Sequence, residues 1–315
     1  MISLRYHIVS LVAVFLALAL GIVVGSTVLK EGSVTLLRAT SNRVRAESEK
    51  TRSDNDQLRA QLGRYEEFSS AVLPQLVRGR LKGQPVVLVD TDKVDDPTRD
   101  KVIEAMKAAG AVVDGRITFS SDRLALAADG DRNTLGRLLA VDTADAAAER
   151  SALIGQVVDR LALPTRLPQD KRVRAGDVLT GLNDAKFLAD LPLQRQFKSG
   201  QEAFPRPGTL FVLIGPTDQT TLPPDDFLIP LADRLSDRAA AVVGVEKAAG
   251  PVSWVAALRD ARGVNQRVSS VDDVDLAYGQ VAVVEALQRW LQTRVTGQYG
   301  SKSGASGLLP EKPGS

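Results

Sequence analysis

The sequence predicts an α/β protein with an N-terminal transmembrane helix, a helical coiled-coil stalk and a Rossmann-like parallel-sheet domain. Three observations support this class: an unbroken apolar run near the N-terminus, a charged stretch without proline after it, and a long region where apolar segments alternate with amphipathic ones. The alternation of apolar and amphipathic segments is typical of a parallel sheet covered by helices on both faces. We expect a membrane anchor over 1–29, a charged stalk over 30–80, an exported α/β domain over 81–296 and a disordered Gly/Ser tail over 297–315.

The N-terminal segment is predicted to cross a membrane. No residue between Arg5 and Lys30 carries a full charge, and a helix of this length spans roughly 30–35 Å, the thickness of a bilayer core. The run is longer than the apolar region of most cleaved signal peptides, so we favour an uncleaved anchor over a cleaved signal. Only five residues precede the run, which favours a cytoplasmic N-terminus with residues 30–315 outside, although basic residues flank both ends.

Small residues recur every four positions along this anchor. Such a stripe lets two helix backbones approach closely within lipid, which predicts self-association of the membrane segment. The alternative is that alanine and glycine are simply common in membrane spans. The stripe consists of Ala13, Ala17, Gly21 and Gly25.

The stalk carries half of a heptad seam. Residues 38–67 contain seven Lys/Arg and six Asp/Glu with no proline, a composition typical of a solvated helix. The other half of the seam is poor, because polar residues (Thr40, Glu47, Asp54 and Gln61) occupy the complementary positions three residues further on, and Pro74 ends the pattern. The seam predicts a parallel coiled coil that joins two or more copies, and a single solvated spacer helix is the alternative. Its positions are Leu37, Val44, Thr51, Leu58, Tyr65 and Val72, with Leu62 and Phe68 beside its end.

The α/β domain is predicted from a succession of strands and helices. A buried strand at 85–90 is followed by a helix that starts near Asp96-Pro97 and by a second strand reaching Phe119, which together make a βαβ unit. Residues 130–205 are predicted to be helical and irregular, with helices near 134–140, 145–161 and 177–188. Later strands are expected at 209–214, 239–245 and 267–270, and later helices at 227–235, 253–261 and 280–293.

Composition excludes several classes of chemistry. The chain has no cysteine, one histidine and two methionines, so disulfides, zinc fingers and cysteine nucleophiles are excluded. The one histidine, His7, lies at the membrane edge, which leaves no serine–histidine–aspartate mechanism for the rest of the chain. A formal net charge of +2 and 4% aromatic residues give no indication of nucleic-acid binding. We therefore predict no catalytic residue, and a carboxylate-dependent hydrolase is a minor alternative.

Three carboxylates between the last predicted strand and helix are the candidate site. Asp272, Asp273 and Asp275 follow a strand, at the end where open parallel sheets bind ligands. They are candidates for contact with a ligand or a partner, and hard cations favour such oxygen ligands. The structural alternative is that they cap the following helix and complement its dipole.

Both ends of the chain resemble a known family. The N-terminal part comprises Met1-Ile2-Ser3-Leu4-Arg5, Val9-Ser10-Leu11, Ala13 to Ala19 and Gly25-Ser26; the C-terminal part comprises Ser270 to Asp275, Gly279, Ala286-Leu287 and Tyr299-Gly300. These segments resemble the MctB-type mycobacterial copper transport protein B family of actinobacteria, which includes SteB-like envelope proteins. The match covers about a fifth of the chain, and the middle is similar only in texture.

The resemblance implies a cell-envelope protein with a role in copper homeostasis or export, in the outer membrane for the namesake. The SteB-like branch implies instead a scaffold that binds a membrane protein in envelope assembly or division. Copper is thus implied by the family alone: it prefers Cys, Met and His ligands, and beyond the anchor the chain offers only Met106. The residues themselves favour a non-catalytic scaffold that forms homo-oligomers through its stalk.

Overall fold

The computed structural model describes residues 4–143, 145–162, 165–166, 177–190, 203–238, 241–250 and 253–311. The chain divides into two compact units, Met1–Tyr65 and Glu66–Ser315. In this division the unit that contains the sheet begins at Glu66.

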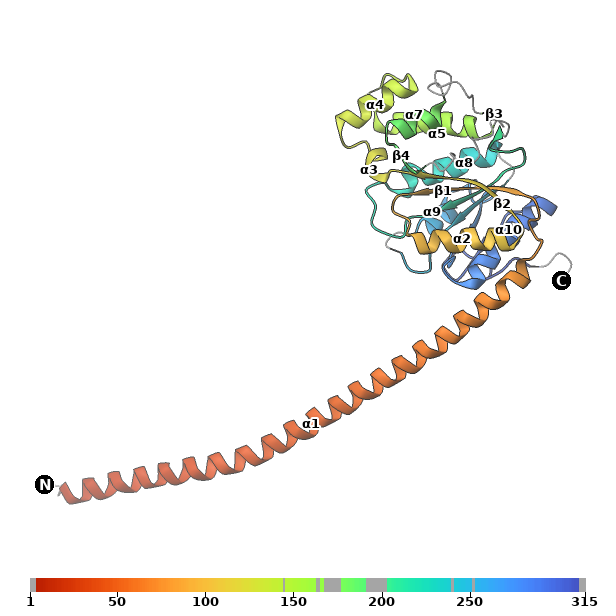
Figure 1. Ribbon diagram of the computed structural model, residues 1–315. Helices are drawn as coiled ribbons and strands as arrows, with labels where there is room; N and C mark the ends of the chain where they lie inside the picture. Colours follow the sequence, from red (N-terminus) through yellow and green to blue (C-terminus); the bar gives the residue numbers. More distant parts are fainter. Residues whose placement is uncertain are drawn as a thin grey trace. The chain divides into compact units, whose positions relative to one another are not determined.

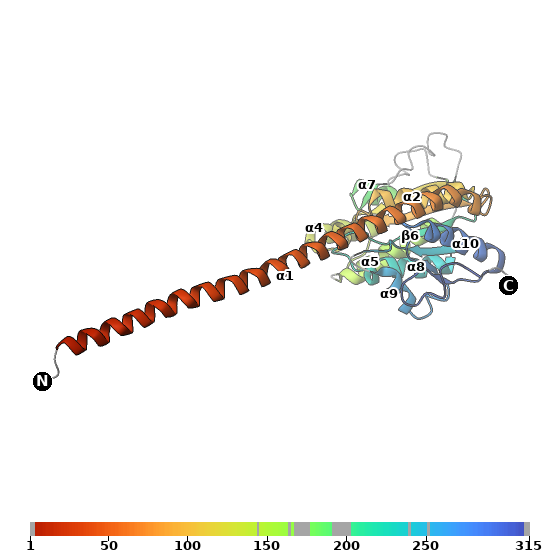
Figure 2. The same cartoon turned by 90° about the horizontal axis from the view of Figure 1, so that it is seen from below.

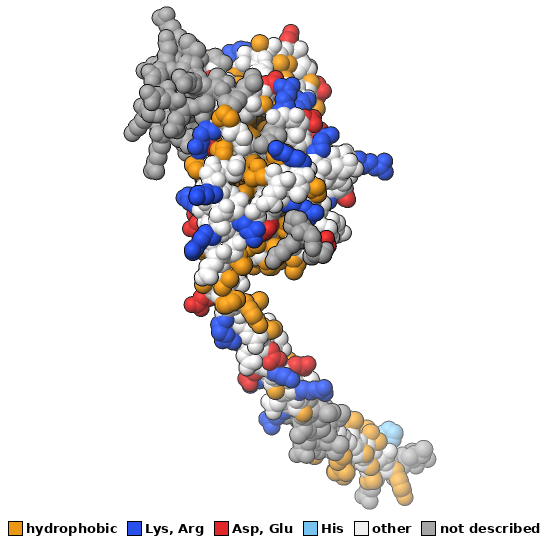
Figure 3. Space-filling view, turned by 90° about the vertical axis from the view of Figure 1, so that its right-hand side faces the viewer, with side chains coloured by type: hydrophobic (Ala, Val, Ile, Leu, Met, Phe, Trp, Pro, Cys, Tyr) orange, Lys and Arg blue, Asp and Glu red, His pale blue; other side chains and the backbone are white. Residues whose placement is uncertain are grey.

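A single helix, α1, runs from Leu4 to Val77 and confirms the predicted N-terminal apolar helix. Its segment Tyr6–Gly25 has a mean hydropathy of 2.9 and no buried residue, and by length and composition it can cross a membrane. Charged side chains of both signs gather along the middle of α1, and apolar ones along its N-terminal end (Figure 3).

Proline does not end α1 where the sequence suggested. The helix continues through Pro74 to Val77, and the reason is packing within the second unit. Leu73 and Val77 are buried in the core of the α/β unit, so tertiary contacts hold the last turn together despite the missing N–H.

A seven-stranded sheet forms the centre of the α/β unit. Its strand order is β4-β2-β1-β6-β7-β8-β9, and every neighbouring pair is parallel except β2 and β4. A separate two-stranded antiparallel sheet joins β3 (Thr165–Arg166) and β5 (Ala203–Phe204). The main strands are β1 (Pro85–Thr91), β2 (Val112–Phe119), β4 (Leu188–Asp190), β6 (Leu210–Ile214), β7 (Ala241–Val245), β8 (Ser269–Val271) and β9 (Gln298–Tyr299).

The central strands are buried from end to end, which explains why they were recognisable as continuous apolar runs. Every residue of β1, β6 and β7 is buried, as expected where helices cover both faces of a parallel sheet. The sequence therefore predicted the parallel sheet correctly. It did not predict β4, an antiparallel edge strand at the place where the sequence suggested the end of a helix.

Helices cover the sheet in two layers (Figures 1 and 2). One layer contains α2 (Asp96–Ala108), α10 (Ala277–Thr293) and the last turns of α1. The helix α2 begins with the side chain of Asp95, which accepts a hydrogen bond from the Thr98 N–H, and Pro97 occupies its first turn. The other layer contains α3 (Ser121–Leu124), α4 (Asp129–Leu139), α5 (Ala146–Ala162), α7 (Val178–Asp184), η1 (Pro224–Asp226), α8 (Leu228–Arg238) and α9 (Trp254–Asp260).

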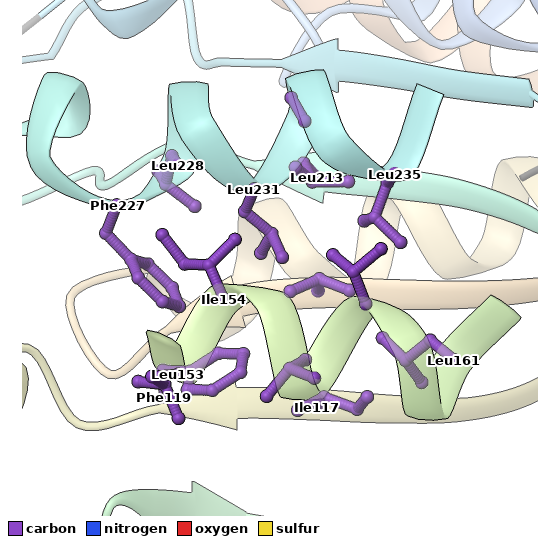
Figure 4. Close-up of a cluster of buried hydrophobic side chains, with 14 of the residues drawn as sticks. Ile117, Phe119, Leu153, Ile154, Leu161, Leu213, Phe227, Leu228, Leu231 and Leu235 are labelled. Atoms are coloured by element: carbon purple, nitrogen blue, oxygen red, sulfur yellow. The ribbon is translucent and has the colours of Figure 1, made fainter. Parts of the chain in front are cut away.

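The larger core lies where α5 and α8 pack against each other and the sheet (Figure 4). Ile154 of α5 faces Leu231 of α8, whereas Leu153 lies on the side of α5 nearer Phe119, and all of these side chains are fully or almost fully buried. The rings of Phe119 and Phe227 meet edge to face, with their centroids 4.8 Å apart. The sequence predicted a helix over 227–235, and the structure places α8 at Leu228–Arg238.

The C-terminal tail is ordered, contrary to the disordered tail expected over 297–315. Gln298–Tyr299 forms β9, which pairs in parallel with β8, and Tyr299 is only 3% exposed. Backbone bonds continue the order beyond the strand, because the Gly300 N–H donates to the Gly307 carbonyl. The composition of small polar residues suggested disorder, but pairing with the sheet and burial of one aromatic side chain overcome it. Residues 312–315 lie outside the described part.

We predict that Tyr299→Ala destabilises the α/β unit by about 3–5 kcal/mol, the usual cost of removing a buried aromatic side chain. Leu309→Ala is the control, because Leu309 is 43% exposed and its loss should change stability by no more than about 0.5 kcal/mol. Urea unfolding of the full-length chain measures both. Equal stability of the two variants would contradict the ordered tail.

Candidate functional site

The sheet has a topological switch point between β1 and β6. From β1 the chain passes through α2 to β2 on one side, whereas β6 lies on the other side of β1 and leads through α8 to β7. The helices that follow the two strands therefore cover opposite faces of the sheet. Open α/β sheets bind ligands outside the carboxyl ends of their strands at such a point, which makes this edge the candidate functional site.

Backbone hydrogen bonds join the two loops at the switch point. The Lys93 carbonyl after β1 accepts from the backbone N–H of Thr217 at 2.9 Å and of Asp218 at 3.1 Å. The Thr217 hydroxyl in turn accepts from the Asp95 N–H at 2.7 Å. The loops after β1 and β6 are thereby tied to each other.

A buried tryptophan fills the space above β6 and β7. The Trp254 ring lies so close to Gly215 and Gly244 that a Cβ atom at either position would overlap with it. Its indole N–H donates to the Val245 carbonyl at 2.8 Å, so the one polar atom of the side chain is satisfied. The residue is fully buried. This part of the edge therefore consists of the chain's own packed side chains.

An ion pair connects the loop after β1 with the loop after β7. Lys247 Nζ lies 2.9 Å from Asp95 Oδ2, and each side chain is about one-third exposed. Burial raises the pKa of Asp95, but hydrogen bonds from Thr98 and Lys247 outweigh it and lower that pKa to about 2. The hydrogen bond to Asp95 correspondingly raises the pKa of Lys247. Both groups are therefore charged at neutral pH.

The carboxylate of Asp272 is buried and engaged within the chain. It is fully buried, lies 2.9 Å from Arg259 Nη2 and accepts from the backbone N–H of Ser301 at 2.7 Å and of Lys302 at 3.2 Å. Burial raises its pKa, and the neighbouring carboxylate of Asp273 raises it further. Asp272 thus anchors the segment that follows β9.

The carboxylate of Asp273 is buried beside it. It accepts from the Tyr278 hydroxyl at 2.9 Å and from the Ser301 N–H at 3.0 Å. Burial raises the pKa of Asp273, but hydrogen bonds from Asp272, Ser301 and Tyr278 outweigh that effect and lower it. Burial and the hydrogen bond to Asp273 raise the pKa of Tyr278 to about 12.

A third buried acid completes the cluster. Glu246, which follows β7, lies 2.7 Å from Lys302 Nζ and accepts hydrogen bonds from the Ser253 hydroxyl and the Val255 N–H. Lys302 also donates to the Lys247 carbonyl at 3.0 Å. The segment after β9 therefore covers the carboxyl ends of β7 and β8, and its own amides and ammonium group neutralise the acids beneath it.

Two glycines permit this close packing. A Cβ atom at Gly279 would overlap with the carbonyl oxygen of Asp273, and one at Gly300 would overlap with the carboxylate of Asp272. Gly300 also has a φ of +128°, which favours glycine. The C-terminal residues that carry the family resemblance, from Ser270 to Gly300, thus come together in one packed unit.

Asp275 lies apart from the buried pair and borders an open groove. Its carboxylate accepts from the Ala248 N–H at 2.7 Å, and its carbonyl accepts from Lys101 Nζ at 2.7 Å. The groove has a volume of about 240 Å³ and lies within the second unit, between the end of α1, α2 and the start of α10. Its lining is Glu66, Ser70, Leu73, Pro74, Lys101, Glu104, Ala105, Ala108, Asp275, Leu276, Ala277 and Gln280.

The three predicted acids thus take two positions. Asp272 and Asp273 hold the C-terminal segment, whereas Asp275 borders the groove. None of them caps the last helix: α10 begins at Leu276 as its cap residue, without a side-chain hydrogen bond. Contact of these acids with a ligand or partner stays a prediction.

The predicted self-association residues lie along α1. Those with described side chains are exposed in the single chain, except for the half-exposed Gly25, and the side chain of Leu37 lies outside the described part. Val44, Leu58 and Tyr65 are 59%, 57% and 69% exposed, so the described part of the chain leaves most of each of these apolar side chains uncovered. The others are Ala13, Ala17 and Gly21.

Ligands suited to copper are scarce. Among the described residues no group of three or more His, Cys, Asp or Glu side chains is arranged to hold a metal ion. The full sequence has no cysteine, one histidine and two methionines. Of these, Met106 is fully buried in the core and His7 lies in the apolar segment. These residues do not fit a copper site in the α/β unit.

Comparison with known proteins decides the family. The model of the family described as "Copper transport outer membrane protein, MctB" matches residues 1–310. The chain belongs to this MctB family. It is 26% identical over 313 residues to a protein of Mycobacterium tuberculosis named copper transporter MctB, which covers 97% of this chain and 98% of that protein. A Mycobacterium leprae protein of the same name is 28% identical over 316 residues, covering 98% and 99%.

This match confirms the family resemblance and extends it from the two ends of the chain to nearly all of it. The MctB family description and the N-terminal apolar helix together indicate a membrane or envelope location. The names of the relatives are those of transporters and not of enzymes.

Several residues of the site could not be found from the sequence. Arg259 and Lys302 come from distant segments, and their pairing with Asp272 and Glu246 depends on the fold. Trp254 is one of only two tryptophans in the sequence, but nothing in the sequence indicated that it lies over the ends of the strands.

We predict that Gly279→Ala destabilises the α/β unit by about 1–3 kcal/mol or more, because the added methyl group must displace the backbone of Asp273. The control is Gly130→Ala in α4, where the methyl group meets open space and alanine favours the helix. Thermal unfolding of the full-length chain compares them. A Gly279→Ala variant as stable as Gly130→Ala would contradict the packing described here.

The ion pair of Asp95 predicts a pH dependence. Because the folded pKa of about 2 lies below the ordinary value of 3.8, its stabilisation is complete above about pH 4 and is lost as the pH falls towards 2. Asp95→Asn should lower stability at pH 7 by about 1 kcal/mol or less, since the pair is partly exposed and screened by salt. The variant should differ less from the unaltered chain at pH 3.

Urea unfolding at pH 7 and pH 3 measures this difference, with Asp100→Asn as a control on the exposed side of the same helix. A difference that stays constant or grows on acidification would show that the ion pair does not stabilise the fold.

Proposed function

We propose that this MctB-family chain is a membrane-anchored protein of the cell envelope that takes part in copper homeostasis by binding other protein chains, without coordinating copper itself. The copper role comes from the names of the family and of its relatives. The mode of action comes from the chain's own residues.

One observation carries this proposal: the side chains that copper prefers are almost absent. Beyond the apolar segment the chain has no cysteine, no histidine and one methionine, and that methionine is fully buried. Carboxylates are weak and unselective copper ligands, and the two best-clustered ones, Asp272 and Asp273, already accept hydrogen bonds from within the chain. A single apolar helix also cannot enclose a pore unless several copies assemble.

The parts that remain for function are contact surfaces. The stalk exposes apolar side chains at heptad spacing, and the groove beside Asp275 carries the acidic residues Glu66 and Glu104. These features support self-association through the stalk and binding of a membrane-protein partner, as in an envelope scaffold.

We predict that copper handling does not depend on the chain's own soft ligands. The test is a strain that lacks the chain, complemented with the His7→Gln, Met106→Leu double variant; the Met→Leu change conserves volume in the core. Copper accumulation should match that of the unaltered chain at equal protein level. Accumulation as high as in the uncomplemented strain would contradict the proposal. If deletion of the chain leaves the copper level of the cell unchanged, the chain has no role in copper homeostasis.

The orientation is also a proposal: the N-terminus is cytoplasmic and the α/β unit lies outside the cytoplasm. Because the chain has no cysteine, a single Ser53→Cys substitution gives a unique label site on the stalk. A membrane-impermeant maleimide should label this variant in intact spheroplasts. Labelling that requires lysis would place the stalk in the cytoplasm.

A further inference from the structure

The middle of α1 is exposed along its length, and no described part of the chain covers it. From residue 38 to residue 65 every side chain is exposed, including Val44, Leu58, Leu62 and Tyr65, each more than half exposed. None of the ion pairs of the described chain involves a side chain of this segment. Both its apolar and its charged side chains are therefore available to another molecule.

The apolar residues define a heptad register. Leu58, Leu62 and Tyr65 are spaced by four and then three residues, the alternation that keeps one stripe on a single face of a coiled-coil helix. Taking Leu58 and Tyr65 as d positions makes Leu62 an a position. In this register the polar residues Thr40, Glu47, Asp54 and Gln61 occupy g positions, which flank the seam and commonly carry charged side chains. The a row is Ser41, Ser48, Asn55 and Leu62, and the d row is Val44, Thr51, Leu58 and Tyr65.

The flanking charges then match a second copy in parallel register. Arg52 and Arg59 lie at e positions, and Glu47 and Asp54 lie at g positions. In a parallel pair each g residue faces the e residue five positions later on the other helix, so Glu47 meets Arg52 and Asp54 meets Arg59. An antiparallel pair would instead bring the e rows together, and their arginines would repel each other.

Asn55 indicates the number of strands. It is an asparagine at an a position, and a buried asparagine there specifies the register and favours two strands, because its amide can pair with the same amide of the partner helix. A parallel arrangement also agrees with an apolar segment at the N-terminus of each copy, since two anchors in one membrane point the same way.

We infer that α1 binds a second copy of this chain as a parallel, in-register, two-stranded coiled coil over residues 44–65. The inference rests on the self-association included in the proposed function, and it adds the occupant, the direction, the register and the pairing residues. In this dimer the a and d residues form the buried seam, and four interchain ion pairs flank it.

Disulfide trapping tests the register. The chain has no native cysteine, so Ser48→Cys at an a position and Ser53→Cys at an f position form a matched pair. In the full-length chain in nanodiscs, diamide should cross-link Ser48→Cys to a covalent dimer and leave Ser53→Cys monomeric. Equal cross-linking of the two variants would overturn the register. After the masses of lipid and scaffold protein are subtracted, each nanodisc with the unaltered protein should contain two chains of 33.7 kDa. A mass of three chains would overturn the two-stranded form but leave self-association intact.

Charge reversal tests the pairing residues. The Glu47→Arg, Asp54→Arg variant should form a dimer weaker by about tenfold or more, because four exposed ion pairs become repulsive. The Arg52→Glu, Arg59→Glu variant should be weakened similarly, and a mixture of the two should form heterodimers. Glu49→Arg, Asp56→Arg is the control, since it makes the same charge change at b positions that face away from the seam.

Fluorescence energy transfer between labelled full-length chains in detergent measures these affinities. Unchanged dimers of the reversed variants, or weakening equal to that of the control, would overturn the pairing. If the wild-type chain stays monomeric at all concentrations, the self-association in the proposed function is contradicted as well.

Discussion

Hydrogen bonds from the C-terminal segment to two buried carboxylates hold the carboxyl edge of the sheet closed. Asp272 and Asp273 are fully or almost fully buried, and the backbone N–H groups of Ser301 and Lys302 supply part of their solvation. Arg259 adds the opposite charge. Removing one partner of such a group leaves a buried charge uncompensated, which costs several kcal/mol. The order of β9, the close approach of Gly300 and the position of Lys302 over Glu246 all depend on this contact.

This closure bears on the kind of function that the fold performs. In many open α/β sheets the strand ends leave room for a ligand, whereas here Trp254 fills the end of β6 and β7 and the C-terminal segment covers β7 and β8. The outward-facing features are instead the apolar helix, the charged stalk and the groove beside Asp275. They support a protein that acts by contact with other chains. The scarcity of soft ligands points the same way, since copper bound by this chain would need donors that it lacks.

Much of the fold could be predicted because its signals are local. The strands β1, β6 and β7 are buried throughout, so their sequences are unbroken apolar runs, and Pro97 with the acids before it indicates the start of α2. The errors arose where long-range contacts outweigh local composition. Gly300 belongs to a segment that resembles a flexible tail, yet its missing Cβ is what allows contact with Asp272.

The same reasoning explains the partial success at the site. A cluster of acids after a strand was recognisable, but its partners Arg259 and Ser301 lie outside the cluster in sequence. The sequence therefore did not show that Asp272 and Asp273 have partners within the chain. Pro74 is a further example, because packing of Leu73 and Val77 in the core keeps α1 helical past a residue that usually ends helices.

We propose that this MctB-family protein acts through contacts between chains and does not bind copper itself. Native mass spectrometry of the full-length chain, released from detergent micelles after incubation with Cu(I), tests both parts in one spectrum. We expect a mass of two chains with no stoichiometric copper. A single chain, or a complex that carries one copper ion per chain, would contradict it.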